Sequence, residues 1–133
     1  MKKTSFGLLL LAIVLFISPA CKKSSGPTES NLVVVTTPAN ASNNLNILGP
    51  DFPLKIEITS TMPPSGVKIT VNASIDGQAN STFFTATNNS TAQVNNYSIT
   101  NTPSSVTCVV NITVTSISKS SNVWTGAYRY SKK

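Results

Sequence analysis

The chain has 133 residues, with ten lysines and arginines, four aspartates and glutamates, and no histidine. Beyond residue 30 there are six basic and three acidic residues, too scattered to form a nucleic-acid-binding surface. The lack of histidine, together with only two cysteines, excludes zinc centres and most nucleophilic triads.

The first predicted element, residues 1–20, has the pattern of a cleavable signal peptide. Lys2 and Lys3 give it a positive start, and residues 6–17 are a run of apolar residues with one glycine. Twelve residues are fewer than the roughly 18 to 20 that a helix needs to cross hydrocarbon. The small residues Ser18 and Ala20 then provide a cleavage site. We therefore expect the chain to be exported.

A cysteine follows this site in the run "SPACKKSSG", which resembles a bacterial lipoprotein signal. The resemblance implies cleavage before Cys21 and lipidation of its sulfur. A lipobox usually has a Leu-like residue three positions before the cysteine, where this chain has Ser18. An ordinary signal peptidase would cut the same bond and leave Cys21 unmodified. An anchor of two or three acyl chains, which the resemblance implies, would attach the protein stably to a membrane.

Residues 21–30 are predicted to be the lipidated cysteine and a flexible tether, because "KKSSGPTES" contains no apolar residue. The run "CKKSSG" before a β-rich domain resembles lipoproteins of the Bacteroidetes. In that group, acidic residues just after the cysteine are associated with export to the cell surface, and they are absent here. We therefore expect an anchor in the outer or inner membrane, with the periplasmic face favoured over the cell surface.

Residues 31–133 are predicted to form one domain of seven strands separated by turn residues. Alternating apolar residues are clearest at 54–60, 67–75 and 105–116. A polar connection at 38–53 and turns at Asp76-Gly77 and 88–90 punctuate the pattern. The predicted strands are 31–37, 54–60, 67–75, 81–87, 92–100, 105–116 and 123–130.

The spacing of these strands is typical of an all-β sandwich. The stretches "VKITVNASIDGQ" and "TVTSISKSSNVW" resemble bacterial immunoglobulin-like domains, and the whole pattern also resembles the fibronectin type III group. The resemblance implies a single immunoglobulin-like β-sandwich of about seven antiparallel strands. The Cys–Trp–Cys signature of antibody domains is missing, since Trp124 lies in the last predicted strand.

Two details of the strands raise local predictions. The alternation at 92–100 changes phase between Val94 and Tyr97, which predicts a bulge at Asn95-Asn96 that would turn both Val94 and Tyr97 inward. Phe83 and Phe84 are adjacent, so a regular strand would direct one of them away from the core.

Cys108 lies on the apolar face of strand 105–116, where a small buried hydrophobic residue is expected. A reactive thiol is the alternative, but no histidine exists to activate it. If Cys21 carries lipid, no intramolecular disulfide is possible. If Cys21 is unmodified, a Cys21–Cys108 bridge is conceivable in an oxidising compartment.

The four acidic residues do not predict an active site. Glu29 lies in the tether, Asp51 and Asp76 in turns, and Glu57 on the polar face of a strand. A glycosidase pair needs two carboxyl groups at a defined separation, and calcium needs clustered carboxylates. We therefore expect no enzymatic activity, no metal and no cofactor.

Three aromatic residues in the last strand are the candidates for a ligand-binding surface. Trp124, Tyr128 and Tyr130 share one face, and exposed aromatic rows stack on sugars or peptides. The alternative is that this face is the core side of the sandwich. The expected partners are therefore the membrane, through the N-terminal lipid, and a protein or carbohydrate ligand.

Together these observations indicate a membrane-anchored, non-enzymatic envelope protein that acts in adhesion, as a spacer or as an accessory binding module. A carbohydrate-binding accessory lipoprotein is one alternative, and it requires an exposed aromatic row. A subunit of a surface polymer or fimbria is another, and it requires an unpaired sheet edge, which a strand missing from the 38–53 connection would reveal.

Overall fold

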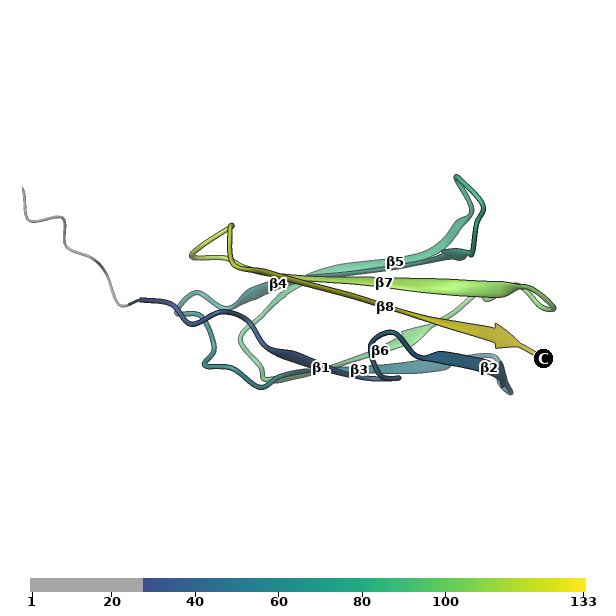
Figure 1. Cartoon of the computed structure of the whole chain (residues 1–133), viewed down its shortest axis with the longest axis horizontal. Coiled ribbons are helices and arrows are strands. Elements are labelled where there is room, and N and C mark those ends of the chain that lie inside the picture. The colour runs from purple at the N-terminus through teal and green to yellow at the C-terminus, as the bar shows by residue number, and fades with distance from the viewer. Residues whose placement is uncertain (1–27) are drawn as a thin grey trace, which may run out of the picture.

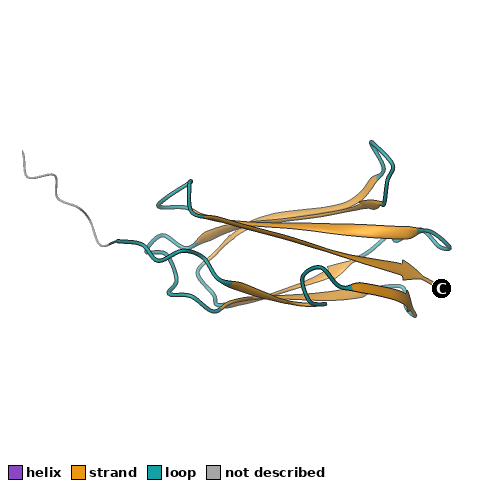
Figure 2. Cartoon of the chain, viewed as in Figure 1, coloured by secondary structure: helices purple, strands orange, loops and turns teal. Residues whose placement is uncertain are grey.

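The computed structural model describes residues 28–133, so the expected signal peptide and Cys21 lie outside the described residues. Strands and their connections make up this part of the chain, with no helix (Figure 2). It accordingly holds no helical segment of the length and apolarity that crossing a bilayer demands. The strands form two stacked layers (Figure 1), which confirms the predicted all-β sandwich architecture.

One layer is an antiparallel sheet of three strands in the order β1-β3-β6. The other has five strands in the order β2-β8-β7-β4-β5, all antiparallel except that β2 runs parallel to β8. The strands are β1 (Val34–Thr37), β2 (Asn43–Ile47), β3 (Phe52–Ile58), β4 (Val67–Ile75), β5 (Thr82–Ser90), β6 (Val94–Ile99), β7 (Thr107–Ser116) and β8 (Val123–Lys132).

The core lies between the two sheets and follows the alternation in the sequence. Side chains at every second position of β3, β4 and β7 are almost completely buried, and the intervening ones are more exposed. Burial of such side chains is the main favourable term in folding. These core residues are Leu54, Ile56 and Ile58, then Val67, Ile69, Val71 and Ala73, then Cys108, Val110, Ile112 and Val114.

The connection at 38–53 contains an eighth strand that the sequence pattern did not predict. Strand β2 pairs with the end of β8, with Asn43 opposite Arg129. Backbone bonds from Ala41 N to Ala127 O at 2.7 Å and from Arg129 N to Ser42 O at 3.0 Å begin this pairing. The prediction of a polar connection was wrong here. Backbone hydrogen bonds hold this edge strand, so it forms without the alternation of apolar residues by which a strand is recognised in a sequence.

Strand β5 is longer than predicted, since it continues through Asn88, Asn89 and Ser90. These residues pair with Ile69, Lys68 and Val67 of β4. The prediction of a turn at 88–90 was therefore wrong. The backbone bonds offered by β4 outweigh the low strand preference of asparagine and serine.

The predicted bulge in β6 is also absent. Its register with β3 is continuous, with Asn95 buried opposite Ile56 and Val94 exposed opposite Glu57. The buried Asn95 amide donates to Ala92 O at 3.0 Å, so the strand accepts a polar residue inward without changing phase.

A bulge occurs instead at the start of β5. The register shifts so that Ala73 pairs with Phe84 and Ser74 with Thr82, which leaves Phe83 as the extra residue. Phe83 and Phe84 are both half-buried and both pack against the core. Because of this bulge, neither phenylalanine ring is fully exposed to solvent.

Candidate functional site

The beginning of the described chain is fastened to the turn between β7 and β8. Glu29 accepts a hydrogen bond from the Ser118 hydroxyl at 2.9 Å and another from the Asn122 amide at 2.6 Å. These contacts join residues about ninety positions apart in the sequence. In Figure 1 this segment enters the sandwich beside the β7–β8 turn. We call Glu29, Ser118 and Asn122 the clasp.

Asn122 is the centre of the clasp. Its side chain is 6% exposed, its amide also donates to Ser30 O at 2.9 Å, and its carbonyl oxygen accepts from Leu32 N at 2.9 Å. One amide therefore satisfies backbone groups at two positions as well as a carboxylate, which fixes the direction in which the chain enters the domain.

The clasp favours the charged form of Glu29. The Ser116 hydroxyl, the Asn122 amide and the Ser118 hydroxyl lower the pKa of the Glu29 carboxyl, while burial acts in the opposite direction. Hydrogen bonds donated to a carboxylate stabilise its ionised state. At neutral pH, Glu29 is therefore an acceptor that the β7–β8 turn holds in place.

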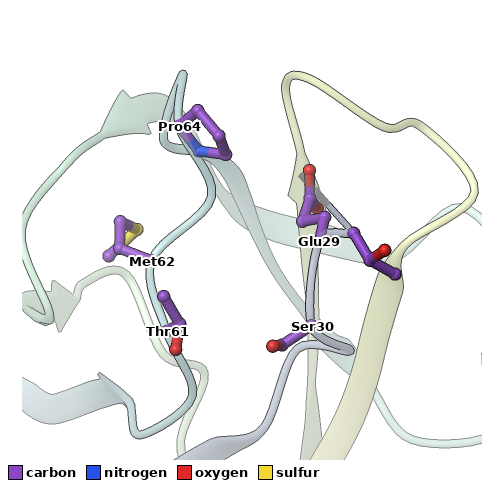
Figure 3. Close-up of a pocket in the computed structure, with 6 residues that line it drawn as sticks. Glu29, Ser30, Thr61, Met62 and Pro64 are labelled. Atoms are coloured by element: carbon purple, nitrogen blue, oxygen red, sulfur yellow. The ribbon is translucent and has the colours of Figure 1, made fainter. Parts of the chain in front are cut away.

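A cavity of about 120 Å³ lies beside the clasp. Figure 3 shows Glu29 and Ser30 on one side of it and Thr61, Met62 and Pro64 on the other. Glu29 is the ionisable group in this lining, and it already accepts two side-chain hydrogen bonds. The cavity has room for a few water molecules, but its lining offers no pair of groups for acid–base or nucleophilic chemistry.

No cluster of three or more metal-ligating histidine, cysteine, aspartate or glutamate residues occurs within residues 28–133. Two of the acids are paired with cations: Glu57 with Lys55 at 2.9 Å and Asp76 with Arg129 at 2.8 Å. Both pairs are partly exposed to solvent, where ion pairs contribute little to stability.

The clasp moves the boundary of the predicted tether. Residues 21–30 were expected to be flexible, but Glu29 and Ser30 make specific contacts with the domain. Glu29 and Ser30 therefore belong with the domain, whereas residues 21–27, including Cys21, the candidate for lipidation, lie outside the described residues.

The three aromatic residues proposed as a ligand surface do not form an exposed row. Tyr128 and Tyr130 are 2% and 0% exposed, and Trp124 is half-buried against the core. The ring of Trp124 lies over Gly126, where an added Cβ would be 2.3 Å from the ring. This face of β8 is the core side, so the ligand-surface hypothesis is wrong for both tyrosines.

The buried tyrosine hydroxyls differ in their partners. Tyr130 OH lies 2.7 Å from Thr102 Oγ1, whereas Tyr128 OH has no hydrogen-bond partner among the described residues. Burial raises the pKa of Tyr130 to about 12, and it raises the pKa of Tyr128 further. Neither phenol is available as an acid or a base at neutral pH.

Cys108 is a free, fully buried cysteine, as the small-hydrophobe interpretation predicts. Burial raises the pKa of its thiol, which keeps it protonated and unreactive. The alternative of a reactive thiol has no support from its surroundings.

Sequence reasoning missed Asn122 and Ser118, because the residues around 119–122 carried only a turn signal. No local pattern marks an asparagine that bonds a segment ninety positions earlier. Comparisons with known proteins add no guide, since no family model, curated protein or solved structure matches this chain.

Proposed function

We propose that this protein is a non-enzymatic envelope lipoprotein that displays a β-sandwich a short distance from a membrane. The clasp carries this proposal. Within the described residues, side-chain contacts hold Glu29 on the domain, and Glu29 lies eight residues after the cysteine expected to carry lipid. At about 3.3 Å per residue the intervening chain spans at most roughly 26 Å. The domain would therefore stay near the bilayer and serve as a spacer or binding module.

We further propose that the domain is immunoglobulin-like. The order of the strands supports this proposal. The order β8-β7-β4-β5 corresponds to strands G-F-C-C′ of variable-type immunoglobulin domains, and the order β1-β3-β6 corresponds to strands A, B and E. The parallel pairing of β2 with β8 extends the larger sheet on its other side.

The test is fatty-acid labelling of the protein in a bacterial host, followed by separation of membrane and soluble fractions. Wild-type protein should incorporate an alkyne-tagged fatty acid and stay with the membrane. Cys21→Ser should lose both properties, because no acceptor sulfur remains at the expected mature end. Cys108→Ser is the matched control and should keep both, since Cys108 is buried in the core. Equal labelling of wild type and Cys21→Ser would refute the proposal.

The carbohydrate-binding alternative required an exposed aromatic row, and burial of Tyr128 and Tyr130 removes that row. The polymer-subunit alternative keeps one supporting observation. Strand β5 ends the larger sheet, pairs with β4 on one side, and contains neither a charged residue nor proline. Natural edge strands often use such residues to block further pairing. We infer that strand addition at β5 is the second candidate function.

Its test compares Thr87→Lys with Thr113→Lys in the detergent-solubilised full chain. Thr87 lies on the β5 edge, and Thr113 lies in the same cross-strand row within the sheet, because both pair with Thr70. Strand addition predicts assemblies of wild type and Thr113→Lys, and monomers of Thr87→Lys, in sedimentation experiments. A monomeric wild-type protein at high concentration would eliminate this candidate.

A further inference from the structure

Exposed apolar side chains gather at the end of the domain where the tether enters. Six large apolar residues of the described chain are well exposed, and four of them are Val33, Val94, Ile117 and Val123. Their exposed fractions lie between 44% and 54%. We call these four residues the apolar belt.

Contacts place three members of the belt around the clasp. Val33 and Val123 directly follow Leu32 and Asn122, which are joined by a hydrogen bond. Ile117 adjoins Ser116, whose amide bonds Asn122 O at 3.0 Å. These residues therefore belong to the same end of the sandwich as Glu29.

Val94 completes the belt at the opposite edge of the three-stranded sheet, on the same outward face as Val33. It opens β6, directly after Gln93, whose carbonyl accepts from Ile58 N at 2.8 Å. Thr59 directly follows β3, and its backbone amide donates a hydrogen bond to Val33 O at 2.9 Å. In Figure 1 the β7–β8 turn, the β3–β4 connection and the start of the described chain gather at this end.

We propose that the apolar belt rests on the interface of the lipid bilayer to which the protein is anchored. This inference depends on the lipid attachment proposed above. A tether of at most roughly 26 Å confines this end of the domain near the bilayer. Partly exposed valine and isoleucine side chains gain free energy when headgroups and acyl chains replace water around them.

The charges near the belt are compatible with an anionic surface. Lys119 is exposed in the β7–β8 turn between Ile117 and Val123, and Lys22 and Lys23 follow the expected lipidated cysteine. Lysines next to an anionic membrane contribute attraction that decays within a Debye length. Two acids of the described chain lie at this end: the clasp already supplies hydrogen-bond donors to Glu29, and Glu57, opposite Val94, is paired with Lys55 at 2.9 Å.

The opposite end provides an internal control. Leu48 is the most exposed large apolar residue, at 78%, and it precedes Asp51 in the connection between β2 and β3. Its exposure exceeds that of any belt residue, but the tether is not attached there. If every exposed apolar residue bound lipid, Leu48 would contact the bilayer as well. If one end of the domain docks, only the belt residues contact it.

The experiment attaches an environment-sensitive dye to Ile117→Cys, Val123→Cys or Leu48→Cys in the full lipidated chain. Cys108 is completely buried, so it does not compete for the dye in the folded protein. Each variant is placed in vesicles of equal parts phosphatidylcholine and anionic phosphatidylglycerol that contain lipids with a spin label near the headgroup. Quenching of the dye then reports its depth.

We expect quenching at positions 117 and 123 to exceed that at position 48 several-fold, and Lys119→Glu to reduce this contrast. Equal quenching at all three positions, in protein that remains bound to the vesicles, would overturn the docking inference alone. Protein that does not sediment with the vesicles and carries no acyl mass would instead refute the proposed lipid attachment. Two dye positions within the belt guard against a single variant that fails to fold.

Discussion

At the scale of single residues, the two tyrosines of β8 show how one hydroxyl can stabilise a core and another can weaken it. Both rings are buried, and Tyr130 packs against Phe52 with ring centroids 4.7 Å apart. The Tyr130 hydroxyl has Thr102 as its partner, whereas the Tyr128 hydroxyl is buried without one in the described chain. An unsatisfied buried polar group costs free energy that a satisfied one does not.

Replacing each tyrosine by phenylalanine should therefore have opposite effects. Tyr130→Phe should lower the free energy of unfolding by about 1 kcal/mol, because it removes a bond and leaves Thr102 unpaired. Tyr128→Phe should leave it unchanged or raise it by up to about 1 kcal/mol, because the lost hydroxyl had no partner. Urea unfolding of the two variants measures both values, and equal destabilisation by both would contradict this assignment.

The same phenols make stability sensitive to alkali. The pKa of Tyr130 is about 12 in the folded protein, above the value of about 10 for an exposed tyrosine. Between these two values the folded state binds more protons than the unfolded state, so stability falls as pH rises. Urea midpoints measured between pH 9 and pH 12 should decline, and the decline should be shallower in the Tyr128→Phe/Tyr130→Phe double variant. A flat profile in the wild type would refute the shift.

Asn122→Ala should be the most damaging single change in the clasp. It removes the acceptor of Leu32 N and the donor to Ser30 O, so we expect a loss of about 2 kcal/mol. Hydrogen exchange at the amides of residues 30–34 should accelerate, since the segment is no longer fastened. The neighbouring, exposed Ser121→Ala is the matched control and should change neither quantity. Unchanged exchange in Asn122→Ala would show that the clasp does not hold this segment.

The clasp should also weaken in acid. The pKa of Glu29 is lowered in the folded protein, so its stabilising contribution is complete above the unfolded-state value and disappears as pH falls through the folded-state value. Protection of the Leu32 amide from exchange should decrease over that range in wild type. In Glu29→Gln the same titration should leave protection unaffected, and identical pH profiles of the two proteins would contradict the role of the carboxylate.

At the scale of elements, the sequence could predict the strands that line the core. In β3, β4 and β7 the branched apolar residues alternate, and burial follows that alternation directly. Strand β2 and the last part of β5 could not be predicted in this way, because asparagine-rich edge strands depend on bonds from a neighbour. The predicted phase of β6 was wrong for a related reason. The hydrogen bond that the Asn95 amide donates to Ala92 O lets this polar side chain point inward.

Two glycines test how closely the elements approach one another. Gly66 and Gly77 both have positive φ, at 80° and 74°, which disfavours any side chain. A Cβ at Gly66 would also lie 2.5 Å from Ser90 O, whereas one at Gly77 would meet nothing within 4 Å. Gly77→Ala should cost about 1 kcal/mol, and Gly66→Ala should cost clearly more. Thermal unfolding measures the difference, and equal costs would contradict the close packing of the β3–β4 connection on β5.

At the scale of the whole molecule, the candidate site was the least predictable feature. Alternation indicates which face of a strand is buried, but it could not reveal that Asn122 bonds Glu29 and Leu32 across the sandwich. It also left open whether the aromatic face of β8 was a core or a ligand surface, because both have the same period of two. Only the arrangement of the sheets decides that this face is inside.

These features combine into one account of the molecule. An expected lipid at Cys21, a short polar tether and a clasp would orient a rigid sandwich with its apolar belt toward the bilayer. The connections at the opposite end, including Asp76-Gly77 and the segment around Leu48, would then face away from the membrane and be accessible to partners.

The most direct measurement is the intact mass of the protein extracted from membranes of its native or a bacterial host. The account predicts a chain that begins at Cys21 and carries the added mass of two or three acyl chains. A mature chain that begins at Cys21 without added mass, recovered from the soluble fraction, would contradict it.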